Sequence, residues 1–285
     1  MSVLTAIFQA IGQAISWLIP ISESGHSAIF HNFSGRFTNA CSQLTGVIHI
    51  GIAIGLIAAF YKLFITLFKG FFASWNDLFH KRLDIKNPKS SRRFMFMTVL
   101  SFVPMLAYLI PAGKYGNIYC VFHRTSYNEN LLGEGICIFL TGVLIIAAMT
   151  LSDKKLHPLP DIAQALILGV IVFLAVPAAG CSVIGAVLCV GIIIGMNEKT
   201  SLRYSVVMSV MILIVMGIIE MCTAVTKISV LIAVIGLIVA AAASFMASKL
   251  LIFLLKKKLL KYVGIYDIAI GFICFIIGIF QIVIK

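Results

Sequence analysis

Six long apolar runs dominate the pattern of hydrophobic and polar positions along the chain. Each run comes close to or exceeds the ~20 residues that an α-helix needs to cross the ~30 Å hydrocarbon core of a bilayer. The pattern therefore predicts an all-α polytopic membrane protein with six transmembrane helices. The runs cover roughly residues 45–68, 94–112, 134–151, 204–226, 228–255 and 262–284.

Two further apolar segments are interrupted by turn-forming residues. Residues 3–35 are broken at "PISESG" and residues 162–196 at "VPAAGCSVIG", so neither half of either segment makes a comfortable span. Both segments are predicted to be re-entrant helical hairpins. Irregular backbone at membrane depth is tolerated only where protein buries it or where it lines a polar cavity. The two hairpin tips are therefore predicted to line a site.

Charge sets the expected orientation. The chain has a formal net charge of +12, with seven Lys and Arg in residues 69–93 and the run "KKKLLK" at residues 256–261. Basic residues gather in cytoplasmic loops of membrane proteins, which accounts for the charge better than nucleic-acid binding does. With both loops inside, residues 1–151 and 152–285 each contain one hairpin and three spans, in opposite orientations. The prediction is one membrane domain with an inverted-topology repeat whose tips meet near the midplane.

Composition agrees with a membrane protein. Hydrophobic residues make up 61% of the chain and charged residues only 11%, about half the charged fraction of a soluble domain. The seven cysteines are scattered singly without metal-ligand spacing, and those in apolar runs resemble small hydrophobic residues.

The first tip contains the polar residues Ser22, Glu23, Ser24, Gly25 and His26. Amides that begin a helix after such a turn bind anions, because their N–H groups are unpaired and the helix dipole is positive there. The serine hydroxyls add donors, and a histidine can act as base, proton donor or nucleophile toward phosphorus. The alternative is a helix N-cap with a structural histidine. Ionisable residues inside a membrane usually have a function, which favours a site.

The second tip contains Gly180, Cys181, Ser182 and Gly185. Small residues let backbones approach closely, which can be packing alone. Its functional interpretation depends on its pairing with the first tip.

Three more ionisable residues lie in apolar runs. Glu220 is expected to face the bundle or a cavity, with a functional and a structural role both open. His49 is interpreted as structural, with Gly51 and Gly55 marking a helix contact. Asp267 is expected to pair with Lys261 or a neighbouring cation.

Taken in order, four segments resemble the undecaprenyl pyrophosphate phosphatase family of the bacitracin-resistance type. They are "PISESGH", "VIHIGIAIGLIAAF", "GCSVIGAVLCVGIIIGMNEKTSLRYS" and "KKKLLKYVGIYDIAIG". The resemblance implies six spans, two re-entrant hairpins and an inverted repeat. It also implies hydrolysis of the C55 isoprenoid diphosphate at the outer face of the bacterial plasma membrane, which recycles the carrier lipid for cell-wall synthesis. Mg²⁺ or Ca²⁺ is the cofactor implied.

The chain departs from the family's pattern at the positions that carry its chemistry. Gln13 and Trp17 stand where the family has two glutamates four residues apart, and Glu23 stands where it has a serine. Val183 occupies the position of the family's arginine, or Cys181 or Ser182 if the register slips, and Asp267 occupies that of a second arginine. No Lys or Arg lies between Lys155 and Lys199, so no register restores the missing cation.

Carried over position by position, the resemblance gives a candidate site. The catalytic candidates are His26, Ser22 and Glu23, and Glu23 is the one candidate metal ligand in a weakened metal site. The substrate-binding candidates are Ser24, Gly25, Ser182, Gly185 and Gln13.

Three functions stay open. The first is a catalytically impaired diphosphatase, the second a transporter or flippase of polyprenyl phosphate, and the third a non-catalytic lipid-binding modulator. Expected partners are a polyprenyl phosphate or diphosphate and membrane lipids, not nucleic acid, and a homodimer is left open.

Overall fold

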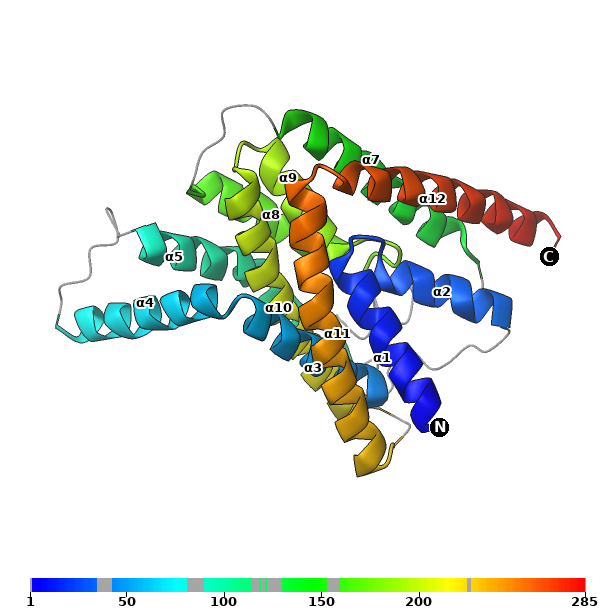
Figure 1. The fold of residues 1–285 in the computed structure, drawn as a ribbon, viewed down its shortest axis with the longest axis horizontal. Helices are drawn as coiled ribbons and strands as arrows, with labels where there is room; N and C mark the ends of the chain where they lie inside the picture. Colours follow the sequence, from blue (N-terminus) through cyan, green and yellow to red (C-terminus); the bar gives the residue numbers. More distant parts are fainter. Residues whose placement is uncertain are drawn as a thin grey trace.

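The structure is a computed structural model that describes residues 2–34, 43–80, 90–113, 118, 121, 130–152, 159–224 and 227–284. These residues form helices and turns without an extended strand (Figure 1). Five helices are long and apolar enough to cross a membrane, and a bent pair of helices brings the number to six if it counts as one span. The predicted all-α polytopic membrane fold is confirmed.

The helices follow one another along the chain. Their bounds are α1 (Val3–Leu18), α2 (Glu23–Ser34), α3 (Gln43–Ala59), α4 (Tyr61–Phe79), α5 (Ser90–Phe102), the 3₁₀ helix η1 (Val103–Leu109), α7 (Leu132–Leu151), α8 (Ile162–Ala175), α9 (Val183–Ile193), α10 (Glu198–Thr223), α11 (Val230–Lys256) and α12 (Leu260–Val283).

The predicted span at residues 45–68 is wrong as a straight helix. α3 and α4 meet at 90°, and Phe60 between them has non-helical dihedral angles (φ −111°, ψ 30°). α3 is apolar and largely buried, whereas α4 carries Lys62 and Lys69 beside exposed aromatic rings. An amphipathic helix is more stable where its polar face is not buried, so α4 does not continue in the direction of the buried helix α3. Figure 1 shows α4 running sideways with α5, away from the steep helices.

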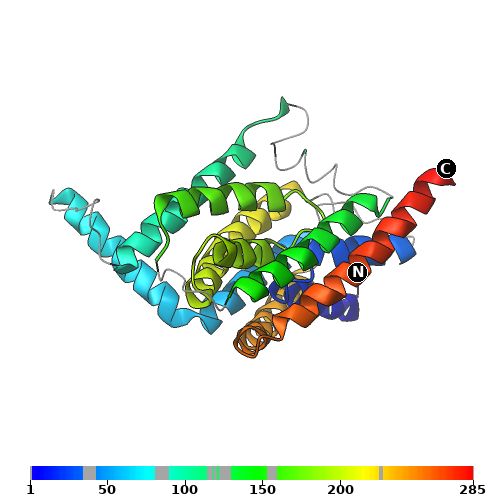
Figure 2. The ribbon, with the colours of Figure 1, turned by 90° about the horizontal axis from the view of Figure 1, so that it is seen from above.

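The spans pack in two groups. α1, α3, α10 and α11 form a bundle, and α7 and α12 lie side by side along a different direction (Figures 1 and 2). Small residues allow both contacts. A Cβ on Gly51 of α3 would lie 2.6 Å from the Leu237 carbonyl of α11, and one on Gly142 of α7 would lie 2.5 Å from the Gly264 carbonyl of α12.

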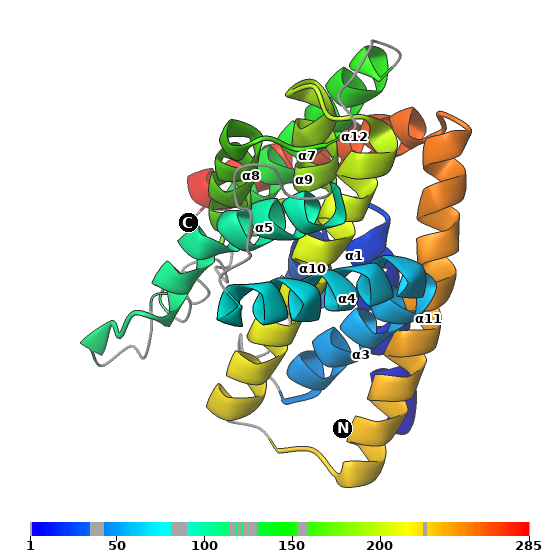
Figure 3. The same ribbon diagram turned by 90° about the vertical axis from the view of Figure 1, so that its left-hand side faces the viewer.

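The two interrupted segments break where the sequence predicts. α1 and α2 are separated by residues 19–22, and α8 and α9 by residues 176–182. Each break contains one residue in the left-handed region, Ser22 (φ 67°) and Gly180 (φ 94°). α1 packs on α11 of the other half of the chain, and α8 packs on α5 (Figure 3). The first hairpin therefore packs against a helix of residues 152–285, and the second against a helix of residues 1–151.

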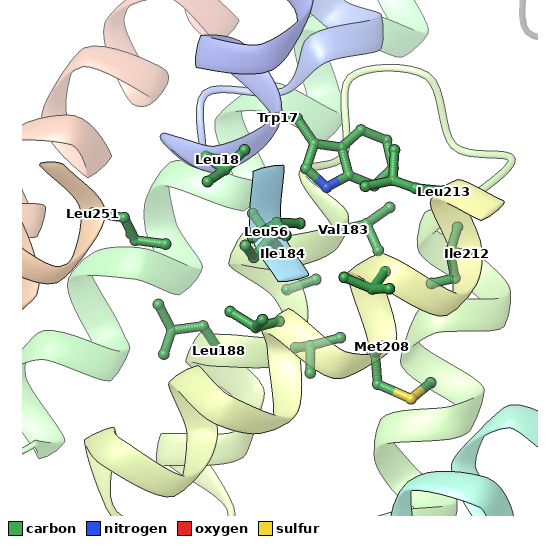
Figure 4. Close-up of a cluster of buried hydrophobic side chains, with 14 of the residues drawn as sticks. Trp17, Leu18, Leu56, Val183, Ile184, Leu188, Met208, Ile212, Leu213 and Leu251 are labelled. Atoms are coloured by element: carbon green, nitrogen blue, oxygen red, sulfur yellow. The ribbon is translucent and has the colours of Figure 1, made fainter. Parts of the chain in front are cut away.

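A hydrophobic cluster fills the space between the hairpins and the bundle. Trp17 and Leu18 of α1, Leu56 of α3 and Leu213 of α10 contribute to it (Figure 4). α9 is almost entirely buried inside this cluster. α9 is thus fixed in the core of the molecule, whereas α8 exposes large apolar side chains such as Ile162 and Leu174.

Candidate functional site

The two hairpin tips are in contact. The Gly180 N–H donates to Ser24 Oγ over 3.1 Å. A Cβ on Gly185 would lie 2.7 Å from Cβ of Pro20, and one on Gly25 would lie 3.0 Å from Cα of Gly180. Small residues on both tips therefore let the backbones meet, as the sequence predicts.

Both tips begin their second helix with the same serine cap. Ser22 Oγ accepts the Gly25 N–H over 3.1 Å, and Ser182 Oγ accepts the Gly185 N–H over 3.2 Å. Each serine is buried and caps the helix that follows it. Ser22 therefore acts as an N-cap through a lone pair of its hydroxyl, and Ser24 Oγ lies 3.3 Å from the same oxygen.

His26 faces α12 across the first tip. Its Nδ1 lies 3.0 Å from the Ser22 carbonyl oxygen, which can only accept, so this nitrogen carries the hydrogen. Its Nε2 lies 2.8 Å from the hydroxyl of Tyr266, which donates to it when the ring is neutral. The two rings stack at 5.9 Å between centroids. The lone pair that a base or nucleophile needs is therefore covered by Tyr266.

Glu23 turns to the opposite side of the tip. Its Oε1 accepts from Ser27 Oγ over 3.3 Å. Gln13 also forms a hydrogen bond with this carboxyl group, and His49 and Glu220 interact with it electrostatically. We call Glu23, His49 and Glu220 the acid–imidazole cluster. The cluster joins α2, α3 and α10.

His49 and Glu220 form a buried pair inside this cluster. His49 Nδ1 and Glu220 Oε2 are 2.7 Å apart, and both residues are buried. His49 Nε2 has no hydrogen-bond partner among the described residues, and the ring lies 5.8 Å from that of Trp17. Sequence analysis singled out each residue but did not bring the two together, because 171 positions separate them.

A small cavity lies between the tips, with a volume of about 40 Å³. This is room for about three water molecules. No Lys or Arg is among the described residues that line it. The lining residues are Ser16, Trp17, Glu23, Ser24, Ala175, Val176, Cys181, Ser182, Val183 and Met216. The cavity thus connects the tips to the acid–imidazole cluster through Glu23.

The expected pairing of Asp267 with Lys261 is wrong. Both carboxylate oxygens of Asp267 are buried without a hydrogen-bond partner among the described residues. The Lys261 ammonium lies instead over the ring of Tyr262, 5.2 Å from its centroid. Six residues on an α-helix turn through about one and two-thirds turns, so the two side chains leave α12 on different sides.

Comparison with known proteins places the chain in a family. The sequence profile of the bacitracin resistance protein BacA matches residues 6–273. The chain belongs to the BacA family. It is 28% identical to the undecaprenyl-diphosphatase of Methanosphaera stadtmanae, covering 98% of this chain and 99% of that protein. It is 26% identical to the undecaprenyl-diphosphatase of Halothermothrix orenii over 100% of this chain and 99% of that protein, and 25% identical to undecaprenyl-diphosphatase 2 of Oenococcus oeni over 73% and 72%.

The residues at the two positions where the sequence resemblance implies glutamates do not fit a divalent metal. Gln13 offers one amide oxygen, and the Trp17 indole offers no lone pair to a metal, whereas Mg²⁺ and Ca²⁺ prefer several charged oxygen ligands. His49 has Nδ1 bonded to Glu220 and offers only Nε2 as a ligand. No group of three His, Cys, Asp or Glu side chains in the described ranges could hold a metal ion.

Sequence analysis overlooked Glu134 at the start of α7. It is buried, with Oε2 lacking a hydrogen-bond partner within the described part of the chain. A Cβ on Gly180 would lie 2.5 Å from the Glu134 carbonyl oxygen, so this residue lies directly behind the second tip. Its place at the edge of an apolar run resembles an ordinary span boundary, which is why the pattern did not reveal it.

Proposed function

We propose that this BacA-family membrane protein binds a polyprenyl phosphate or diphosphate between the two hairpin tips, and that its hydrolytic activity is strongly impaired. One observation carries the proposal. Trp17 and Val183, which replace a glutamate and the arginine of the family's pattern, line the same cavity and both belong to the hydrophobic cluster (Figure 4).

The expected loss of rate is large. A phosphoryl group in transfer carries negative charge, and each cation or metal that stabilises it is worth roughly 10²–10⁵ in rate. Here an indole and an isopropyl group occupy the places of the acid and the cation, and Glu23 adds a negative charge beside them. His26 is left as the nucleophile or acid–base candidate, with Nε2 held by Tyr266.

The tips retain features that favour phosphate binding. The N-termini of α2 and α9 lie next to each other, and both helix dipoles present their positive ends there. Ser24 and Ser182 line the cavity. A phosphate group needs more room than the present cavity provides, so binding requires the Trp17 ring or one tip to move.

We propose the following arrangement for the whole molecule. The halves 1–151 and 152–285 form an inverted repeat, with re-entrant hairpins and a site that faces the outer side of a bacterial plasma membrane. The matched caps at Ser22 and Ser182 support this relation.

A transporter of polyprenyl phosphate is the second candidate. The matched caps and the crossed packing of the hairpins favour it, because alternating access in inverted repeats moves one half against the other around a central site. A transporter needs the binding site but not the lost catalytic groups.

The test is a phosphate-release assay on purified protein with C55 diphosphate, with and without Mg²⁺ or Ca²⁺, alongside a binding measurement with farnesyl phosphate. We expect binding together with release far below the ~1–10³ per second of ordinary enzymes. Release within that range would contradict impairment. Failure to bind the probe would contradict the site. Binding followed by movement of the lipid across a vesicle membrane would select the transporter.

A further inference from the structure

The helix α4 exposes a row of aromatic side chains. Their spacing of seven, four, three and four positions places them on one side of an α-helix. Each is more than half exposed. Phe71 stacks on Trp75 with 6.1 Å between the ring centroids, and the Trp75 ring lies 5.4 Å from that of Phe79, so the rings form a continuous surface. We call Tyr61, Phe68, Phe72, Trp75 and Phe79 the aromatic row.

Two lysines lie beside the aromatic row. Lys62 and Lys69 are exposed and seven positions apart, so they project from one side of α4. The Lys62 ammonium lies 5.8 Å from the centroid of the Tyr61 ring. Asp77, the one carboxylate of α4, is paired with Arg92 of α5 over 2.6 Å and does not neutralise the lysines. α4 therefore combines an apolar surface with positive charge.

The direction of α4 differs from that of every group of spans. α4 meets α3 at 90°. Figure 3 shows it running across α11, and Figure 2 shows it running across the common direction of α7 and α12. A helix that crosses both groups of spans runs along a membrane and not through it. α3 has 17 residues and is at the short end of the range for a span, so the first crossing does not need α4.

The charge of Lys69 agrees with this direction. Lys69 lies near the middle of α4, so a spanning α4 would place its ammonium group in the centre of the hydrocarbon, which is unfavourable for a charge. At the interface between hydrocarbon and headgroups the ammonium stays in a polar layer. Trp and Tyr concentrate in that layer, and helices with aromatic residues on one side and lysines on another lie in it.

We propose that α4 lies in the plane of the membrane, where Lys62 and Lys69 bind the headgroups of anionic lipids and the aromatic row inserts between the lipids. The seven Lys and Arg of residues 69–93 place this surface on the cytoplasmic side, where anionic lipids attract basic segments. A lysine near an anionic surface is worth about a fivefold preference. The inference is independent of the ligand that the hairpin tips bind.

Fluorescence quenching measures the depth of α4. The protein is reconstituted in vesicles of phosphatidylcholine and phosphatidylglycerol that contain lipids with a nitroxide at successive chain positions. Trp17 and Trp75 are its two tryptophans, so the difference between the wild type and Trp75→Phe gives the emission of Trp75. Tyr61→Trp and Phe79→Trp, each combined with Trp75→Phe, report the two ends of α4. We expect one shallow depth for all three positions, whereas a spanning α4 would separate its ends by about 27 Å.

The same emission tests the preference for anionic lipid. Quenching of Trp75 is compared for one label at one chain position, carried either by phosphatidylglycerol or by phosphatidylcholine. We expect stronger quenching by phosphatidylglycerol, and Lys62→Gln and Lys69→Gln should each lower the preference by up to about fivefold. Lys227→Gln is the matched control, because it removes the same charge from the connection between α10 and α11 and should leave the preference unchanged.

Three results would overturn the inference. Ends of α4 at clearly different depths would show that the helix spans the membrane. Equal quenching by the two lipids, or a preference that Lys227→Gln lowers as much, would show that the two lysines bind no headgroup. Weak quenching by every labelled lipid would show that protein, such as a second copy of the chain, covers the aromatic row. The lysine variants keep both tryptophans, so the lipid comparison stands even if Trp75→Phe fails to fold.

Discussion

At the scale of single residues, the sequence resemblance implies a glutamate at position 13 and a serine at position 23. This chain has Gln13 and Glu23, and the two side chains interact. In this chain the carboxyl group is on α2, where it interacts with His49 and Glu220 and also lines the cavity between the tips.

Tyr266 is expected to protect His26 from chemical attack. Tyr266→Phe removes the hydroxyl that donates to His26 Nε2 and frees the lone pair. A hydrogen bond of this kind is worth about 1 kcal/mol, so modification of His26 by diethyl pyrocarbonate should become about fivefold faster. Mass spectrometry of the modified peptide measures the rate, and His80, which is exposed, serves as the internal reference. An unchanged rate would mean that Tyr266 does not control this nitrogen.

At the scale of elements, close backbone packing holds α7 against α12. A Cβ on Gly135 would overlap the backbone of Phe275, and one on Gly271 would overlap that of Phe139. The same surroundings explain why Asp267 is enclosed beside Gly142. Separating the two helices would open this interface along its length.

Gly135→Val should therefore destabilise the protein, with Gly133→Val as its control two positions away on the same helix. Nothing lies within 4 Å of a Cβ placed on Gly133. Overpacking costs about 1–3 kcal/mol, so the apparent melting temperature in detergent should fall by several degrees in Gly135→Val and hardly change in Gly133→Val. Equal melting temperatures for the two variants would contradict the packing.

The helices themselves could largely be predicted from the sequence, because length and hydrophobicity decide whether a segment can span a bilayer. The breaks at Pro20 and Gly180 could be predicted because turn residues interrupt apolar runs. The bend at Phe60 could not, since no Pro or Gly marks it. The link between His49 and Glu220 could not either, because helix packing brings together positions that local patterns do not relate.

At the scale of the whole molecule, the two halves of the chain build one site. The first half supplies Glu23 and His49, and the second supplies Glu220, Ser182 and Val183. Motion of one half against the other would change the cavity and the acid–imidazole cluster together. This arrangement accommodates an impaired enzyme, a transporter or a lipid-binding modulator, and measurements of phosphate release and of lipid movement distinguish them.

Phosphate release from C55 diphosphate by a restored variant tests the central claim most directly. Gln13→Glu, Trp17→Glu, Val183→Arg and Glu23→Ser are combined, so that removal of the indole makes room for the arginine and the acid pair returns. Each change alone should do little, because it leaves an unpaired buried charge or a lone ligand. Arginine at position 181 or 182 is tested in parallel.

The account predicts metal-dependent release by a combined variant and almost none by the wild type. Wild-type turnover at ~1–10³ per second would contradict it. So would combined variants that all fold and bind farnesyl phosphate yet release no phosphate.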